Sequence, residues 1–174
     1  QGQASGGGGS GNHGVDGMKA RPPAGPLPQV VTLSNNASSG FVKSVGANAR
    51  SVIVSQVFPS ERSIAFPMVK EAQTLAAAKG GITLSPAMLE GFAAAKVMVE
   101  ALRRISGKPT REKLQASLDG MGKFYLGGPQ VCHSPQAHTG LDFSDLSNIT
   151  SSGRFRRQND LFRAQRRACV RRLG

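Results

Sequence analysis

The chain has 174 residues, of which 39% are hydrophobic and 5% aromatic, and this composition predicts at most one domain with a modest core. It contains no run of 18 apolar residues, which argues against a membrane-spanning helix. The net charge of +12 would suit a nucleic-acid-binding protein, since Lys and Arg neutralise phosphates. However, residues 154–174 hold eight Arg and one acid, Asp160, so most of the excess charge lies in the C-terminal tail.

Residues 1–28 are rich in Gly, Ser and Pro and contain few apolar side chains. This composition is typical of a flexible segment that cannot bury enough surface to fold. The chain opens without the basic, apolar and small-residue pattern of a secretion signal, so the compartment cannot be predicted from that end.

The first half of the remaining chain predicts a strand, a short helix and a second strand. Gln29–Leu33 is a short run rich in β-branched residues, and the turn-forming sequence SNNASSG follows it. Gly40–Val45 fits a short amphipathic helix, and Arg50–Phe58 is the strongest β-branched run in the chain.

The middle of the chain predicts three helices. One begins near Pro67 and ends at Gly80–Gly81, and the next has Ser85 as its N-cap. Pro109 prevents continuation of the second helix, and Thr110 caps a third that runs to Gly120. On the second helix an apolar stripe at three- and four-residue spacing predicts a face that packs on a sheet: Met88, Phe92, Ala95, Val99 and Leu102.

Two short extended segments, GGPQVCHS and LDFSDLSNIT, complete the pattern. The resulting order of strand, helix, strand, three helices and two strands is typical of an α/β fold with crossover helices.

No catalytic or metal site is predicted. Cys132 and His133 would point to opposite faces of a strand, so they cannot easily share a zinc ion with His138. Asp142 and Asp145 could form a carboxylate pair, but no nucleophile accompanies them. We therefore expect a protein that is not an enzyme and needs no cofactor.

Several linked stretches resemble the C-terminal half of the type I periplasmic substrate-binding proteins of the leucine/isoleucine/valine-binding family. The stretches are LSNNASSGFVKSVGANARSVIVSQVFP, LEGFAAAKVMVEALRR, PTREKLQASLDGM and LGGPQVCHSPQAHTGLDFSDLSNITSSGRFRR. Each alone is modest, and their order and spacing from about Gln29 to Arg157 make the resemblance specific.

The resemblance implies an α/β three-layer sandwich of the type I periplasmic-binding-protein kind, of which about half of the two-lobed fold is present. The strand SVIVSQVFP would belong to the second lobe and run to the hinge. The helices at 88–104 and 110–118 would belong to the first lobe, and SNITSSGRFRR would be a closing strand that crosses back. The N-terminal half of the family fold would be missing, which would leave the stripe from Met88 to Leu102 without its covering sheet.

The function implied by the resemblance is that of the solute-binding component of an ABC transporter, located in the periplasm. Its partners would be a small-molecule ligand of the amino-acid kind and a transporter permease. The ligand-binding positions would be Ser34, Asn35 and Asn36, which follow the first strand. An alternative role for these three residues is an Asx-type turn.

The predicted organisation is therefore a flexible segment at 1–28, a partial binding-protein domain at 29–157 and a basic tail at 158–174. An alternative function is a basic nucleic-acid-associated protein that acts through residues 154–174, where Phe155 and Phe162 could stack on bases. We consider nucleic-acid binding the weaker hypothesis, because no nucleic-acid-binding motif accompanies the tail.

Overall fold

The computed structural model describes residues 4–6, 16, 29–50, 52–136, 138, 140, 141 and 143–158. Most of the predicted flexible segment and the basic tail beyond residue 158 lie outside these ranges, as do Asp142 and Phe162. The described residues form two compact units. Unit 1 contains those between 4 and 57, 85 and 87, and 144 and 158, and unit 2 contains those between 58 and 84 and between 88 and 143.

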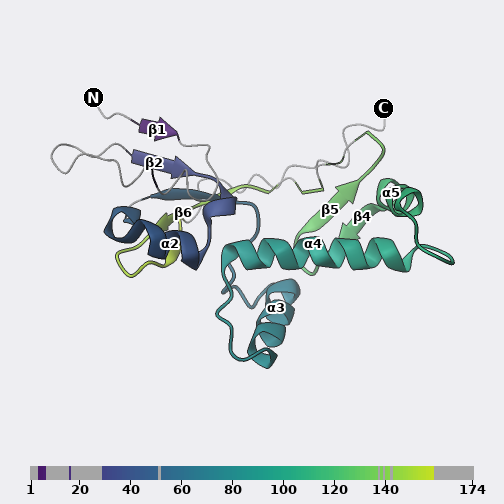
Figure 1. The fold of residues 1–174 in the computed structure, drawn as a ribbon, viewed down its shortest axis with the longest axis horizontal. Coiled ribbons are helices and arrows are strands. Elements are labelled where there is room, and N and C mark those ends of the chain that lie inside the picture. The colour runs from purple at the N-terminus through teal and green to yellow at the C-terminus, as the bar shows by residue number, and fades with distance from the viewer. Residues whose placement is uncertain are drawn as a thin grey trace. The chain divides into compact units, whose positions relative to one another are not determined.

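Unit 1 is built on a five-stranded sheet with the order β1-β2-β3-β6-β7 (Figure 1). Its strands are β1 (Ala4–Gly6), β2 (Gln29–Thr32), β3 (Ile53–Gln56), β6 (Asp145–Ile149) and β7 (Phe155–Arg157). The first three strands are parallel, and β6 and β7 are antiparallel to their neighbours. Within the segment predicted to be flexible, Ala4–Gly6 therefore pairs with β2.

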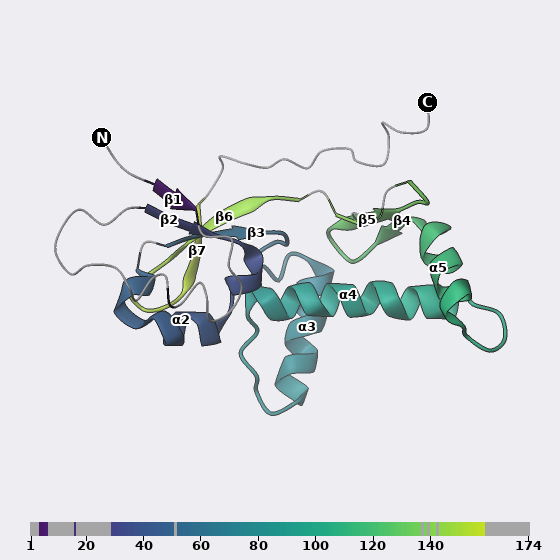
Figure 2. The same ribbon diagram turned by 45° about the horizontal axis from the view of Figure 1, so that its top comes forward.

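A crossover joins the parallel strands β2 and β3, as such strands require. It consists of η1 (Ser34–Asn36), α2 (Ser39–Val45) and η2 (Gly46–Ala49). The Ser38 hydroxyl caps α2 by accepting a hydrogen bond from the Phe41 N–H over 3.1 Å. Figure 2 shows α2 against one face of the sheet, where Phe41 and Val45 pack with Val54 and Ile149 in the core of unit 1.

The predicted closing strand SNITSSGRFRR is in fact a hairpin. Its two strands, β6 and β7, pair with Ile149 opposite Phe155. The chain reverses at Gly153, whose φ of +71° is readily available to glycine, and the Gly153 N–H donates to the Thr150 carbonyl over 2.9 Å. The prediction of a single strand was wrong because it did not treat TSSG as a turn.

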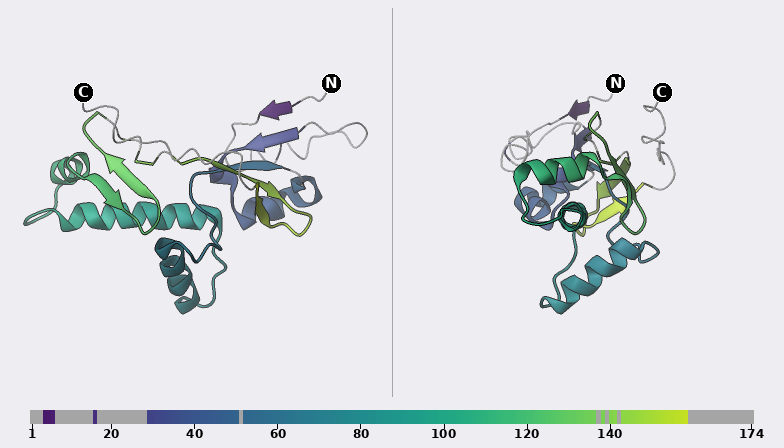
Figure 3. Two further views of the ribbon diagram at one scale, coloured as in Figure 1. Left: turned by 180° about the vertical axis from the view of Figure 1, so that it is seen from behind. Right: turned by 90° about the vertical axis from the view of Figure 1, so that its right-hand side faces the viewer.

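Unit 2 contains three helices and a two-stranded hairpin (Figure 3). The helices are α3 (Pro67–Ala78), α4 (Pro86–Arg103) and α5 (Arg111–Asp119), and the strands are β4 (Gly122–Tyr125) and β5 (Gln130–His133). The predicted starts of α3 and α5 are confirmed, with Pro67 in the first turn and the Thr110 hydroxyl accepting from the Lys113 N–H over 3.3 Å.

Of the β4–β5 hairpin, only the second strand, β5, was predicted from the sequence. Leu126 donates its N–H to the Pro129 carbonyl over 3.0 Å, and the two intervening glycines both have positive φ. Val131 is buried with Leu126 in the core of unit 2, so on β5 the strongly buried side chain is Val131. Cys132 and His133, expected on opposite faces of the strand, are both half-buried.

Of the predicted stripe on α4, Phe92 is partly buried against the core of unit 2, whereas the fully buried residues of the helix lie outside the stripe. Leu89 and Ala93 pack in the core of unit 2 with residues of α3 and of the β4–β5 hairpin. Met88, Val99 and Leu102 are 41%, 45% and 42% exposed. The helix is thus apolar on more than one side. No helix in the described ranges is long and apolar enough to cross a membrane.

Candidate functional site at one edge of the unit 1 sheet

Polar side chains gather at the sheet edge where β2 and β3 end. Because these strands are parallel, their carboxyl ends share one edge, and Thr32 lies opposite Val54. Strand β6 starts at the same edge with Asp145 opposite Gln56, and β7 ends there at Arg157. Ligands of open α/β sheets bind outside the carboxyl ends of the parallel strands. The topology therefore marks this edge as the candidate binding site.

The three predicted ligand-binding residues form η1 at this edge. Ser34 is half-buried, Asn35 is exposed and Asn36 is 3% exposed. The Asn36 side-chain amide donates to the Thr32 hydroxyl over 2.7 Å, and the Ala37 N–H donates to the Ser34 carbonyl over 2.8 Å. Asn36 thus has a structural role, which agrees with the alternative of a turn. Asn35 is the member of the trio whose side chain is open to a ligand.

The start of α4 is fixed beside this turn. Ser85–Ala87 belongs to unit 1, and the Ala87 N–H donates to the Ala37 carbonyl over 3.2 Å. The first N–H groups of a helix carry partial positive charge and lack partners within the helix. Pro86 has no N–H and the Ala87 N–H is bonded to Ala37, so this end of α4 would act on an anion through its partial charge. The edge thus combines an exposed amide side chain with the amino end of a helix.

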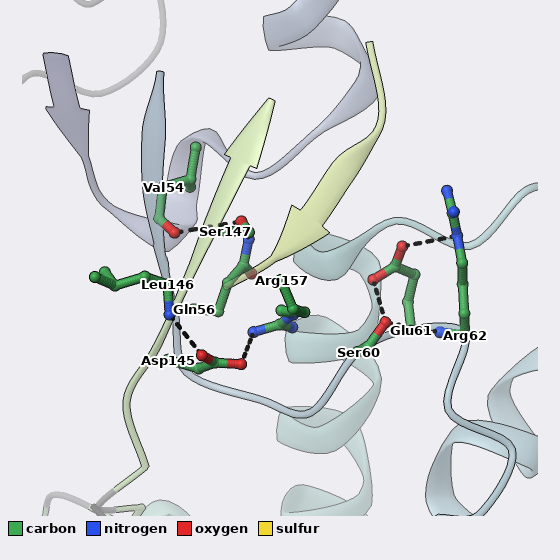
Figure 4. A network of polar contacts seen from close by, with 9 residues as sticks. All are labelled: Val54, Gln56, Ser60, Glu61, Arg62, Asp145, Leu146, Ser147 and Arg157. Carbon is green, nitrogen blue, oxygen red and sulfur yellow. Dashed lines mark hydrogen bonds and ion pairs between the residues drawn. The ribbon is translucent and has the colours of Figure 1, made fainter. Parts of the chain in front are cut away.

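A buried polar network continues the edge across β3 and β6 (Figure 4). The Gln56 side-chain amide donates to the Ser147 hydroxyl over 2.7 Å, and that hydroxyl lies 3.3 Å from the Val54 carbonyl oxygen, to which it donates. Gln56 and Ser147 are at most 2% exposed. Neither residue was predicted from the sequence, although polar residues at inward positions of β-branched strands could have indicated them.

An ion pair closes the end of the network. The Arg157 guanidinium donates from Nη1 to Asp145 Oδ2 over 3.2 Å, and the other carboxylate oxygen accepts from the Leu146 N–H over 2.7 Å. The side chains of Arg157 and Asp145 are 13% and 25% exposed. This pair joins the first residue of β6 to the last residue of β7, so it holds the edge in one register.

The other residues considered for chemistry do not assemble a site. His138 lies 3.7 Å from an Asp119 oxygen, and its side chain is 69% exposed. Asp142, the other member of the predicted carboxylate pair, lies outside the described residues. Across the part of the chain that the structure describes, no group of three His, Cys, Asp or Glu side chains could hold a metal ion.

The fold resembles that of solved binding proteins. No family model matches the chain. No curated protein matches it either. Among solved structures, an extracellular ligand-binding receptor from Verminephrobacter eiseniae matches with a TM-score of 0.70 and 25% identity over 85% of this chain and 42% of its own. A substrate-binding periplasmic protein from Ralstonia solanacearum matches with a TM-score of 0.66 and 28% identity over 77% of this chain and 39% of its own.

A third match has the name that the sequence resemblance anticipated. It is a possible leucine/isoleucine/valine-binding protein from Rhodopirellula baltica, with a TM-score of 0.66 and 24% identity over 75% of this chain and 36% of its own. The chain therefore spans less than half the length of these three proteins. Its fold is about half of the type I periplasmic-binding-protein fold, as predicted. All three are described as binding proteins or receptors, which agrees with the prediction that the chain is not an enzyme.

Proposed function

We propose that the chain is part of a solute-binding component of an ABC transporter that recognises an amino acid or a similar small molecule. The main support is the position of η1, which follows the parallel strand β2 in a fold matched to substrate-binding proteins. One more distant structural match is a branched-chain amino acid ABC transporter protein from Thermus thermophilus with bound valine. Periplasmic location and a transporter permease as partner belong to the same proposal.

The proposed ligand contact is the side chain of Asn35, with Ser34 beside it, whereas Asn36 supports the turn. Asn35 is exposed and offers both a donor and an acceptor. The amino end of α4, tied to the same turn through Ala87 and Ala37, would attract the carboxylate of the ligand. A ligand with both an ammonium and a carboxylate group suits this combination.

The test is ligand-induced stabilisation of the full chain. A tight ligand at about 100 times its Kd would raise the free energy of unfolding by about 2.7 kcal/mol. We expect this increase with at least one of valine, leucine and isoleucine, and a reduced increase in Asn35→Ala. The matched control is Lys43→Ala, an exposed position on α2 outside the edge. If none of the three amino acids raises the stability, the proposal is wrong.

A further inference from the structure

Unit 2 contains a cavity, and none of the residues that line it belongs to the candidate site in unit 1. Its volume is about 320 Å³, at the lower end of the range of about 300–1,000 Å³ that is typical of small-molecule pockets. Glu61, Arg62 and Gln73 contribute a polar side, and Ala76 and Ile82 contribute to an apolar side. The cavity lies among the loop before α3, the second half of α3 and the segment that follows it.

Glu61 gives this cavity a buried negative charge. The side chain is 6% exposed, and its two carboxylate oxygens have one long contact each, 3.4 Å to Arg62 Nε and 3.5 Å to Ser60 Oγ (Figure 4). An ionised carboxylate can accept about four hydrogen bonds. The Glu61 carboxylate therefore has acceptor capacity left for an N–H donor that enters the cavity. Such a donor would be favourable, because burial of a charge without full hydrogen bonding is costly.

Arg62 places a positive charge on the exposed side of Glu61. Its side chain is 58% exposed, and the guanidinium offers five N–H donors, of which Nε faces Glu61. The loop that holds both residues is fixed to α3, because the Gln73 side-chain amide donates to the Glu61 carbonyl over 2.8 Å. The two charges are thus held in a defined order, negative inside and positive outside.

We propose that this cavity binds a small aliphatic zwitterion with a primary ammonium group. The ammonium would donate to the buried Glu61 carboxylate, and the carboxylate of the ligand would accept from the Arg62 guanidinium. The aliphatic part would lie against Ala76 and Ile82. A simple amine would be repelled by the positive charge of Arg62, and a simple carboxylate would be repelled by the negative charge of Glu61. Neither therefore matches the pair as well as a zwitterion does.

This proposal concerns a second site within unit 2 and does not depend on ligand binding at η1. A test on the full chain uses three probes of similar size: valine, isobutylamine, which lacks the carboxylate, and 3-methylbutanoate, which lacks the ammonium. Backbone amide NMR shifts report where each probe binds. We expect valine to shift the amides of Glu61, Ala76 and Ile82. Shifts confined to residues of η1 would overturn the second site while leaving the proposed function intact.

The other two probes test the ligand class. We expect each to bind about tenfold more weakly than valine at these amides, the loss typical of one charge-assisted hydrogen bond. Equal or tighter binding of isobutylamine would overturn the zwitterion proposal in favour of a simple cation. Equal or tighter binding of 3-methylbutanoate would overturn it in favour of a simple anion.

Three variants test the residues. Arg62→Gln changes an exposed side chain and is expected to weaken valine binding at this cavity about tenfold, whereas Arg103→Gln on the exposed end of α4 is expected to leave it unchanged. Ala76→Leu keeps both charges and narrows the cavity, so it should abolish the shifts. Unchanged valine binding in Arg62→Gln and Ala76→Leu would overturn the proposal, and neither result requires a Glu61 variant that folds.

Discussion

The side chain of Gln56 on β3 is hydrogen-bonded to that of Ser147 on β6 over 2.7 Å, and both residues are almost fully buried. The bond joins strands that are 91 residues apart in the sequence. Burial of an amide and a hydroxyl is tolerated because each satisfies the other. The chain leaves unit 1 after Val57, returns briefly at Ser85–Ala87 and re-enters it at Ser144, close to this bond in the sequence. The pair therefore stabilises the pairing of β3 with β6, two strands that are far apart in the sequence and adjacent in the sheet.

We expect Ser147→Ala to lower the free energy of unfolding by about 1–3 kcal/mol, because it leaves the buried Gln56 amide without its partner. The double variant Gln56→Leu/Ser147→Ala should lose less than the sum of the two single variants, since the Gln56 amide is then not left buried without a partner. Urea unfolding of the four proteins gives the coupling energy. Additive losses would contradict the structural role of the bond. Ser55→Ala, on the half-buried opposite face, is the control.

The two apolar sides of α4 should differ in their contribution to stability. Leu89→Ala removes a fully buried side chain and is expected to cost about 2–5 kcal/mol. Leu102→Ala removes a side chain that is 42% exposed and should cost well under half as much. Urea unfolding measures both variants of the same helix. A larger loss in Leu102→Ala would mean that the predicted stripe, rather than the Leu89 side, carries the packing.

The turn between β4 and β5 should tolerate no side chain at its first glycine. Gly127 has a φ of +99°, and a Cβ there would lie 2.8 Å from the backbone nitrogen of Met68. The control is Gly81→Ala, which has a similar strain at φ +72° but meets no atom within 4 Å. The backbone strain alone costs about 1–2 kcal/mol. We expect Gly127→Ala to lose clearly more than Gly81→Ala in thermal unfolding, and equal losses would contradict the close approach of the turn to α3.

Glu112 in the first turn of α5 should titrate below its ordinary pKa of 4.5. The hydrogen bond from its own backbone N–H lowers the pKa most, followed by the Thr110 hydroxyl. Because the pKa is lower in the folded state, the stabilisation by the ionised group is present above pH 4.5 and is lost as the pH falls through the folded value. NMR titration of the Glu112 carboxyl carbon checks the direction of the shift.

The Thr110→Ala variant separates the two contributions. It removes the hydroxyl contact and should raise the Glu112 pKa part of the way back towards 4.5. It also removes the N-cap that the Lys113 N–H uses, at a cost of about 1 kcal/mol of stability. A Glu112 pKa that does not move in this variant would show that the backbone alone sets it.

Local sequence signals were sufficient for most helix and strand positions. The helix starts at Pro67 and Thr110 and the strand β3 depend on residues that are close together in the sequence. They can therefore be predicted without knowledge of the fold. The β6–β7 hairpin and β4 were missed because each depends on a glycine in a turn, Gly153 and Gly127, whose positive φ only becomes necessary once the strands pair. The resemblance to half a binding protein rested on motif order, and the structural matches agree with it.

The sequence by itself determined the α/β class and the turn after β2 that carries the predicted ligand residues, because propensity and turn chemistry are local properties. Only the tertiary structure decided which of these residues are exposed. The Asn36 side chain is buried and hydrogen-bonded to Thr32, whereas Asn35 is exposed, although the two are adjacent in the sequence. The buried Gln56–Ser147 bond and the Glu61 cavity likewise required the fold. Burial and long-range pairing depend on which distant segments meet, and no local pattern specifies that.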